Sequence, residues 1–289
     1  MNMEPERINH LKQLVEKRTG CRFSNYNPGT FQRRLLRRMS ALGIYDIDEY
    51  EAYLQKTPLE YQTLLHSLTI KVSEFFRDTE IFSYLEQQII PALFERHAQQ
   101  NDRNIRIWST ACAYGEEVYS TAILLFEYLQ RMEEKERKKW NITLLGTDID
   151  QMAIEKAMKA VYPIKSIEDV LSTHPDAFQR IIGMPEHMQL IPEIQDMAQF
   201  VCFDITTVKH LAPPIGIFTE YDIIYCRNVL IYYDYQQKLD TLRRLCECLN
   251  PDGYLVLGKA ESMPDELLES LAPVKHGIKI YKKGPADHG

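Results

Sequence analysis

The chain has 289 residues, 45% of them hydrophobic, which is enough for one large globular domain or two ordinary ones without disulfide or metal staples. Its formal net charge of −7 argues against a wholly basic nucleic-acid binder, so we expect no nucleic-acid partner. No apolar run approaches the length of about 18 residues typical of a membrane span, and residues 1–10 lack a signal-peptide pattern. The sequence therefore predicts a cytoplasmic protein without membrane insertion.

The N-terminal third has the apolar spacing of helices. Residues 1–100 carry as many basic as acidic side chains, so the net charge lies entirely in the rest of the chain, and this shift predicts two domains with different partners. Apolar residues recur at helical intervals, with Gly20 and Gly43 as stop signals. Helices are predicted around residues 8–15, 31–42, 47–54, 59–68 and 81–98.

The second of these helices carries four arginines on one side. On a helical wheel, Arg33, Arg34, Arg37 and Arg38 span about 140° opposite the apolar residues, which predicts one continuous exposed face. Two interpretations are open at this point. The face is either simply solvated, or it is a docking strip for an acidic partner.

From residue 105 onward, β-prone runs alternate with helical segments. Strands are predicted at residues 105–108, 143–147, 200–203, 221–226, 253–257 and 278–281. Helices are predicted at about residues 117–131, 151–160 and 235–249. This alternation predicts a parallel α/β sheet, whose ligands bind beyond the carboxyl ends of the strands.

Polar residues at the predicted strand ends are candidates for a binding site. The loop after the first strand holds a single glycine, Gly115, so it supports dinucleotide binding only weakly. Asp148 ends the second strand, where an acid can bind ribose hydroxyls. Glu117 has the simpler alternative of complementing a helix dipole, and Tyr232 and Tyr233 have that of plain core or surface aromatics. The spacing of cysteines and histidines predicts free thiols and no metal site.

Four segments, in order along nearly the whole chain, resemble the CheR-type chemotaxis receptor methyltransferases. They are Ser73–Arg77, Trp108–Ser120, Thr147–Asp150 and Cys226–Tyr232. The resemblance implies an all-helical N-terminal domain followed by a Rossmann-like class I methyltransferase domain of the α/β class with a small antiparallel β-subdomain. The implied boundaries are 1–75 for the helical domain, 76–98 for a linker and helix, and 99–289 for the methyltransferase domain, with the β-subdomain near 183–203.

The resemblance also implies an activity. Members of this family transfer a methyl group from S-adenosylmethionine to glutamate side chains on the cytoplasmic helical bundle of chemoreceptors, which gives glutamyl methyl esters in sensory adaptation. The implied cofactor is S-adenosylmethionine, and the implied partner is the acidic cytoplasmic domain of a methyl-accepting chemotaxis receptor, bound by a monomeric enzyme. Under this reading, Arg33, Arg34, Arg37 and Arg38 dock the substrate.

Individual site residues follow from the same resemblance. Asp148 is expected to hold the ribose hydroxyls and Glu117 the cationic methionine end of the cofactor. Arg77 and Tyr232 are the implied catalytic residues, because a guanidinium fork and a hydroxyl can orient a substrate carboxylate without acting as a base. The full implied cofactor-binding set is Lys71, Ser73, Arg77, Glu117, Asp148, Asp204, Ile205, Arg227 and Asn228.

The chain departs from the family pattern at three places. Ala113-Tyr114 stands where the family usually has Ser-Thr, so Tyr114 is expected to add bulk beside the cofactor. Lys71 and Asp204 each stand where asparagine is common, and we expect their charges to compensate one another. Two alternatives therefore stay open, namely a non-catalytic cofactor-sensing or docking module, and a carboxyl methyltransferase that acts on another protein or a small carboxylate.

Overall fold

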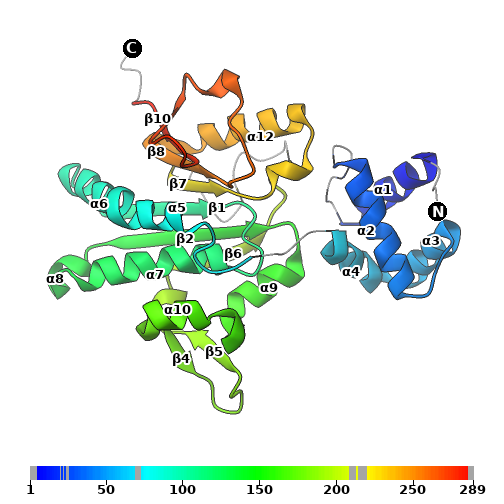
Figure 1. Cartoon of the computed structure of the whole chain (residues 1–289), viewed down its shortest axis with the longest axis horizontal. Helices are drawn as coiled ribbons and strands as arrows, with labels where there is room; N and C mark the ends of the chain where they lie inside the picture. Colours follow the sequence, from blue (N-terminus) through cyan, green and yellow to red (C-terminus); the bar gives the residue numbers. More distant parts are fainter. Residues whose placement is uncertain are drawn as a thin grey trace.

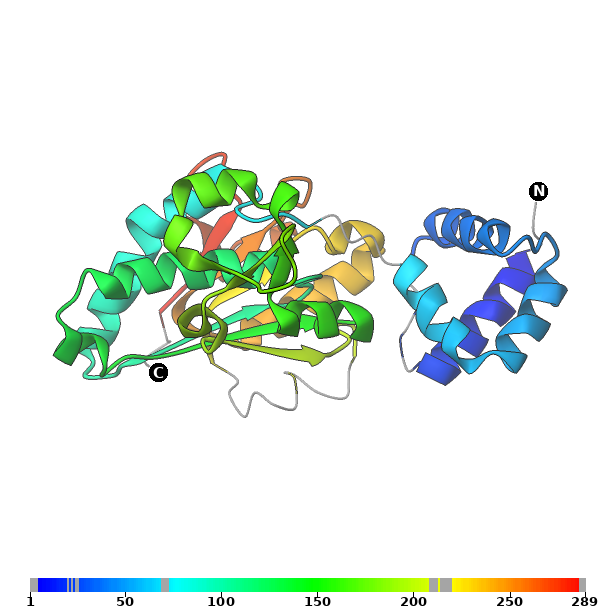
Figure 2. The same ribbon diagram turned by 90° about the horizontal axis from the view of Figure 1, so that it is seen from below.

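The computed structural model describes residues 5–19, 21, 23, 26–68, 73–207, 213 and 220–285. Lys71 lies outside these residues, and so does its expected pairing with Asp204. A helical N-terminal domain stands next to an α/β domain, at the end of the sheet toward which the parallel strands point (Figures 1 and 2). Each helix within the described ranges is too short or too polar to cross a lipid bilayer.

The N-terminal domain has its own hydrophobic core, as the sequence predicts. Its helices are α1 (Pro5–Thr19), α2 (Pro28–Ala41), α3 (Ile47–Lys56) and α4 (Pro58–Leu68). The Asn27 side chain caps the N-terminus of α2, and the Asp46 side chain accepts two backbone N–H groups at the start of α3. The helices pack through fully buried side chains that include Leu11, Phe31, Leu35, Leu54 and Leu64.

The arginines of α2 do not form one exposed face. Arg33 and Arg37 are exposed, but Arg34 is only 8% exposed. Arg38 forms a bidentate ion pair with the buried carboxylate of Glu60, at 2.7 Å for both bonds. The prediction of a continuous strip is therefore wrong for Arg34 and Arg38. A helical wheel separates polar from apolar positions, but it does not show that α4 packs against part of the polar side.

A nearly continuous helical segment precedes the first strand and packs against the sheet. It consists of α5 (Thr79–Tyr84), a π-helical turn (Leu85–Ile89) and α6 (Ile90–Gln99). Pro91 follows the π-helical turn, and a proline cannot donate the usual backbone hydrogen bond to the preceding turn. The single helix predicted at residues 81–98 is confirmed apart from this local change in winding.

The main sheet has seven strands in the order β6-β2-β1-β7-β8-β10-β9. They are β1 (Asn104–Ser109), β2 (Asn141–Asp148), β6 (Ala198–Cys202), β7 (Tyr221–Cys226), β8 (Leu249–Leu257), β9 (Leu271–Pro273) and β10 (Ile280–Lys283). The first five strands in this order are parallel, whereas β10 is antiparallel to both of its neighbours. The sheet is thus mixed rather than wholly parallel, because a short connection joins β9 to β10 where a parallel pair would need a crossover.

Helices cover both faces of the sheet. On one face, α5, α6, α7 (Glu116–Gln130) and α9 (Gln151–Lys159) contribute to one buried cluster, and on the other face α12 (Tyr235–Glu247) packs through Leu239, Leu242 and Leu245. The chain runs from β1 outward to β2 and β6 and then returns to place β7 on the other side of β1. Such a reversal of strand order opens a crevice beyond the carboxyl ends of the two strands.

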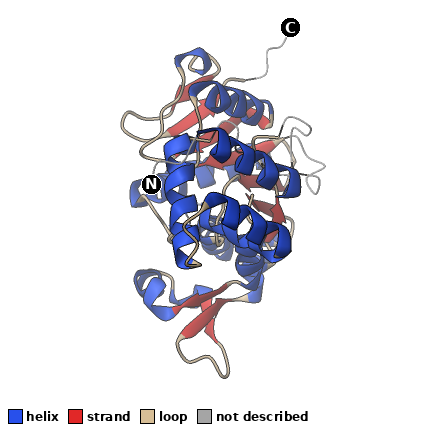
Figure 3. Cartoon of the chain, turned by 90° about the vertical axis from the view of Figure 1, so that its right-hand side faces the viewer, coloured by secondary structure: helices blue, strands red, loops and turns tan. Residues whose placement is uncertain are grey.

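A small antiparallel sheet projects from the α/β domain (Figure 3). It contains β3 (Val161–Pro163), β4 (Phe178–Arg180) and β5 (His187–Leu190), in the order β3-β5-β4, and α10 (Glu168–Thr173) lies between β3 and β4 in the sequence. The predicted position near residues 183–203 is wrong for β3 and β4 and holds only β5, because the three strands span residues 161–190 and residues 198–202 form β6 of the main sheet. Short helices, α8 (Glu134–Arg137) and α11 (Pro192–Gln195), complete the connections.

Candidate active site

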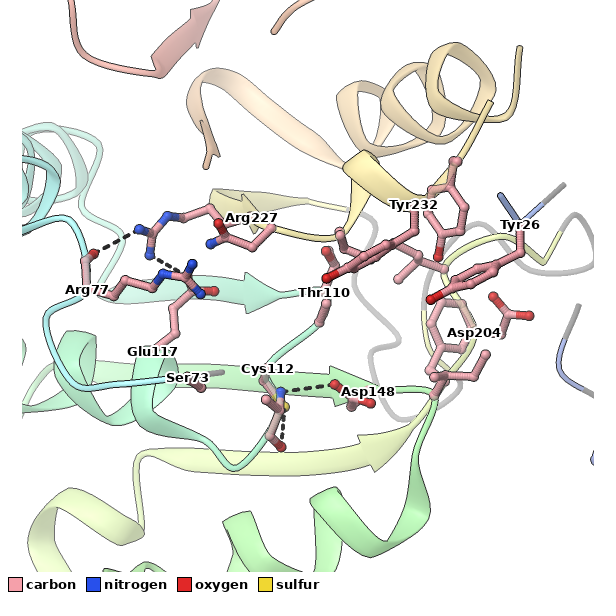
Figure 4. Close-up of a pocket in the computed structure, with 18 of the residues that line it drawn as sticks. Tyr26, Ser73, Arg77, Thr110, Cys112, Glu117, Asp148, Asp204, Arg227 and Tyr232 are labelled. Carbon is pink, nitrogen blue, oxygen red and sulfur yellow. Dashed lines mark hydrogen bonds and ion pairs between the residues drawn. The ribbon is translucent and has the colours of Figure 1, made fainter. Parts of the chain in front are cut away.

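A cavity lies beyond the carboxyl ends of β1, β2, β6 and β7 (Figure 4). It contains about 1020 Å³ of space free of protein atoms, part of it open to solvent, and Phe23 and Tyr26 of the N-terminal domain line one side. Every described residue of the predicted cofactor-binding and catalytic sets lines this cavity. These residues are Ser73, Arg77, Glu117, Asp148, Asp204, Ile205, Arg227, Asn228 and Tyr232.

The Asp148 carboxylate is held by backbone groups at the end of β2. One oxygen, Oδ2, accepts the N–H of Ala113 at 3.0 Å, and the other, Oδ1, accepts the N–H of Asp150 at 3.0 Å. The residue is buried, with 8% of its surface exposed. A carboxylate oxygen can accept more than one hydrogen bond, so Asp148 retains acceptor capacity toward the cavity.

The loop that follows β1 turns sharply at Gly115. This glycine has a φ of 93°, and a Cβ there would lie 3.0 Å from the Ala157 Cβ, so a side chain would be both strained and crowded. Tyr114 turns away from the cavity, since it lies beneath the Lys156 ammonium at 4.8 Å and is not among the lining residues. The expectation that Tyr114 crowds the cofactor is therefore wrong, because the turn at Gly115 directs the preceding side chain outward.

The buried guanidinium of Arg227 bonds to three groups at the end of the cavity opposite Asp148. Arg227, with 5% of its surface exposed, donates to the carboxylates of Glu117 and Asp78 at 2.7 Å each, and to the carbonyl of Arg77 at 2.8 Å. Burial lowers the pKa of Arg227, but the two carboxylates raise it by more. Glu117 also accepts the Ser109 hydroxyl at 2.7 Å. Arg227 thereby fixes the segment that carries Arg77 and compensates the charge of Glu117.

Two buried glutamates, Glu261 and Glu116, support the cavity, and only Glu116 lies in a segment that the sequence analysis singled out. Glu261 accepts the backbone N–H groups of Asn228, Val229 and Leu230 at 2.8–3.0 Å, which fixes the turn that leads to Tyr232. Burial raises the pKa of Glu261, although these backbone bonds lower it in part. Glu116 is likewise buried, which raises its pKa, while bonds from backbone groups and the Ser73 hydroxyl act in the opposite direction.

Tyr26 is the contribution of the N-terminal domain that sequence reasoning missed. Its ring stacks on that of Tyr232 at 5.7 Å between centroids, with 20° between the ring planes. The two segments also pair through their backbones, since the N–H of Asn27 donates to the carbonyl of Tyr232 at 3.1 Å and Tyr26 forms an isolated bridge with Tyr233. The cavity is thus completed by both domains.

Two family models match the chain. The CheR methyltransferase all-alpha domain matches residues 6–69, and the CheR methyltransferase SAM-binding domain matches residues 71–278. The chain belongs to the CheR methyltransferase family. It is therefore a methyltransferase that depends on S-adenosylmethionine, and its two domains match the predicted fold class.

Relatives of this CheR-family enzyme match over most of its length. A chemotaxis protein methyltransferase of Salmonella typhimurium is 30% identical over 261 residues, which cover 89% of this chain and 84% of the relative. One of Klebsiella aerogenes is 31% identical over 256 residues, with 87% and 81% covered. One of Borreliella burgdorferi is 26% identical over 296 residues, with 98% and 96% covered.

The residues that line the cavity fit S-adenosylmethionine, which combines a ribose diol, a flat adenine ring and a charged methionine end. Asp148 offers carboxylate acceptors at the strand end where a ribose is commonly bound. Phe203 and Ile205 provide apolar surface for a flat ring, and the Glu117 carboxylate, paired with Arg227, lines the far end. These individual assignments remain predictions, whereas the convergence of the residues on one cavity is observed.

Proposed function

We propose that this enzyme methylates glutamate side chains on the cytoplasmic helical bundle of a chemoreceptor and forms glutamyl methyl esters. The names of the relatives, chemotaxis protein methyltransferases, support a role in chemotaxis. The observation that carries the proposal is the convergence of Arg77 and Tyr232 on the cavity that also holds the predicted cofactor-binding residues. A guanidinium and a hydroxyl in one cavity suit a carboxylate substrate.

The proposed reaction needs orientation rather than proton removal. A glutamate side chain, with an ordinary pKa near 4.3, is already ionised at neutral pH, so the site needs no general base. When bound, S-adenosylmethionine supplies a methyl group on a positively charged sulfur. Arg77 presents a rigid fork of N–H donors to the substrate carboxylate, and Tyr232 donates one hydrogen bond that aims the attacking oxygen. Holding the reacting atoms in line supplies most of the rate enhancement.

The stacked rings of Tyr26 and Tyr232 have a second role in the proposed reaction. They place a large apolar surface at the junction of the two domains, which limits the access of water to the cavity. Opposite charges meet in this displacement, and their attraction is stronger where water is scarce. The two tyrosines therefore favour transfer to the carboxylate over loss of the methyl group to water.

The exposed arginines of α2 are the proposed docking contacts for the receptor. Arg33 and Arg37 are exposed on the N-terminal domain, whose Tyr26 also lines the cavity. Exposed positive charge attracts an acidic helical bundle over a distance that salt limits to about 8–10 Å at 0.1–0.15 M ionic strength. Only these two of the four predicted docking residues are fully available to a partner.

Transfer of labelled methyl from S-adenosylmethionine to a panel of receptor cytoplasmic fragments tests the proposal. We expect incorporation that is released as methanol by mild base, which identifies an ester. The double variant Arg33→Glu, Arg37→Glu should raise KM for the receptor, with cofactor affinity unchanged. Binding of cofactor with no transfer to any protein would favour a non-catalytic module. Transfer to other proteins but not to receptor fragments would favour a carboxyl methyltransferase with a different substrate.

A further inference from the structure

Arg34 points inward, toward the junction of the two domains. Its Nη1 donates to the Tyr26 hydroxyl at 2.7 Å and also to the Leu68 carbonyl, and the Tyr26 hydroxyl in turn donates to the same carbonyl at 3.0 Å. The guanidinium carbon lies 5.2 Å from the centroid of the Tyr232 ring and 6.0 Å from that of the Tyr26 ring. Arg34 itself does not line the cavity, but both tyrosines do.

Arg34 is a buried cation that is held by a carbonyl at the C-terminal end of α4 and not by an ion pair with a described residue. Only 8% of its surface is exposed, and no carboxylate pairs with it within the part of the chain that the structure describes. Its Nη2 is buried without a hydrogen-bond partner there. A buried charge normally has an opposite charge beside it, because desolvation is costly. Arg38, four residues further along α2, follows that rule through its ion pair with Glu60.

We propose that Arg34 is a positioning residue for methyl transfer, which acts through Tyr232. The inference rests on the proposed role of Tyr232 as the group that orients the substrate carboxylate. Arg34, held by Tyr26 and the Leu68 carbonyl, lies against the Tyr232 ring and restricts its orientation. The guanidinium lies beside the stacked pair of rings, within 6.0 Å of both centroids, so the N-terminal domain contacts the Tyr232 ring and sets the direction of its hydroxyl.

The contact between the Arg34 guanidinium and the Tyr232 ring also has an electrostatic consequence. A cation over an aromatic ring is attracted to the electron density of the ring. The same charge draws density away from the Tyr232 hydroxyl and makes it a stronger hydrogen-bond donor toward an incoming carboxylate. Arg34 therefore contributes to the rate of transfer, whereas the exposed Arg37 on the same helix contributes to the encounter with the receptor. The four arginines of α2 differ in role because they differ in burial.

The test compares Arg34→Met with Arg37→Met in steady-state transfer to a receptor fragment. Methionine keeps much of the length and apolar stem of arginine and removes the charge. We expect Arg34→Met to lower kcat roughly 2- to 30-fold, the range of a cation–π contact, with the KM for receptor and the cofactor Kd nearly unchanged. Arg37→Met should raise KM and leave kcat unchanged. Arg34→Lys, which keeps the charge but not the planar fork, should fall between wild type and Arg34→Met.

A cycle with Tyr232→Phe separates positioning from a general loss of stability. If Arg34 acts through the Tyr232 hydroxyl, the double variant Arg34→Met, Tyr232→Phe should have the kcat of Tyr232→Phe alone, because the hydroxyl that Arg34 orients is already absent. Multiplicative losses would overturn the proposal. Tyr26→Phe is a milder change, which removes the hydrogen bond between Arg34 and the Tyr26 hydroxyl and keeps the stacking of the two rings. It tests the same proposal by its effect on kcat if Arg34→Met fails to fold.

A spectroscopic readout keeps the result independent of the receptor substrate. In protein labelled with 3-fluorotyrosine, the ¹⁹F signal of Tyr232 is identified by its absence in Tyr232→Phe. The signal should shift in Arg34→Met and stay in place in Arg37→Met. If wild type methylates no receptor fragment, the proposed function fails, and the ¹⁹F shift still decides whether Arg34 orients Tyr232. An unchanged signal, or an Arg34→Met variant with wild-type kcat and raised KM, would overturn the proposal.

Discussion

Replacing Asp148 with alanine removes a carboxylate that holds two backbone groups and is predicted to bind the cofactor ribose. Two backbone N–H groups, those of Ala113 and Asp150, lose their acceptor. A buried N–H without a partner costs about 1–3 kcal/mol, so the free energy of unfolding should fall by about 2–6 kcal/mol. The ribose loses an acceptor as well, and a comparable cost of about 1–3 kcal/mol weakens cofactor affinity roughly 5- to 150-fold.

Two further variants separate these effects. Asp148→Asn keeps one carbonyl oxygen for a backbone N–H, so it should lose less stability than Asp148→Ala and still bind cofactor more weakly. Asp46→Ala is the matched control, because Asp46 also accepts two backbone N–H groups but lies at the start of α3, away from the cavity. It should lose about 0.5–2 kcal/mol of stability and bind cofactor normally.

Urea denaturation and calorimetric titration with S-adenosylhomocysteine measure the two quantities on the same preparations. The assignment of Asp148 to the ribose would be refuted if the folded Asp148→Ala protein bound with wild-type affinity. Equal losses of affinity in Asp148→Ala and Asp46→Ala would show that weaker binding follows from lower stability in general. In either case the carboxylate at the end of β2 would have a structural role alone.

Three other residues give sharp expectations. Burial lowers the pKa of His97, but its hydrogen bonds to Asp222 and Asp102 raise it by more. The stability that protonated His97 provides is therefore present below its unfolded pKa of about 6.5, and it is lost as pH rises through the raised pKa of the folded state. The stability difference between wild type and His97→Gln in urea should therefore shrink between pH 6 and pH 9, and a constant difference would contradict this. Arg227→Met leaves two carboxylates without their cation and should cost about 3–5 kcal/mol in the same assay, more than Arg37→Met on the surface. Gly115→Ala should lower both stability and cofactor affinity because of its positive φ, and a wild-type melting temperature would contradict the strain argument.

The sequence predicts elements best where the hydrophobic period is long or continuous. The strand predicted at residues 221–226 matches β7 residue for residue, because six consecutive buried side chains leave no alternative boundary. The strands of the small sheet have only three or four residues, which is too short for a period to emerge. Its predicted position came from the family resemblance alone and was about 20 residues too far along the chain.

That Asp148 and Arg227 line one cavity was predictable because both residues follow strand ends. Asp148 comes directly at the end of β2 and Arg227 directly after β7, and parallel strands bring their carboxyl ends together. Tyr26, Arg34 and Glu261 could not be found in this way. Tyr26 and Arg34 meet Tyr232 about 200 residues away, and Glu261 meets backbone groups more than 30 residues away, and neither a period nor a motif encodes such contacts.

Because the two stacked tyrosines belong to different domains, the cavity couples two folding units that have separate hydrophobic cores. A ligand that occupies it stabilises only states in which both units are folded and docked, by about 2.7 kcal/mol at a concentration one hundred times its Kd. Heating the ligand-free protein should then melt the units at different temperatures, and saturating ligand should merge the two steps into one.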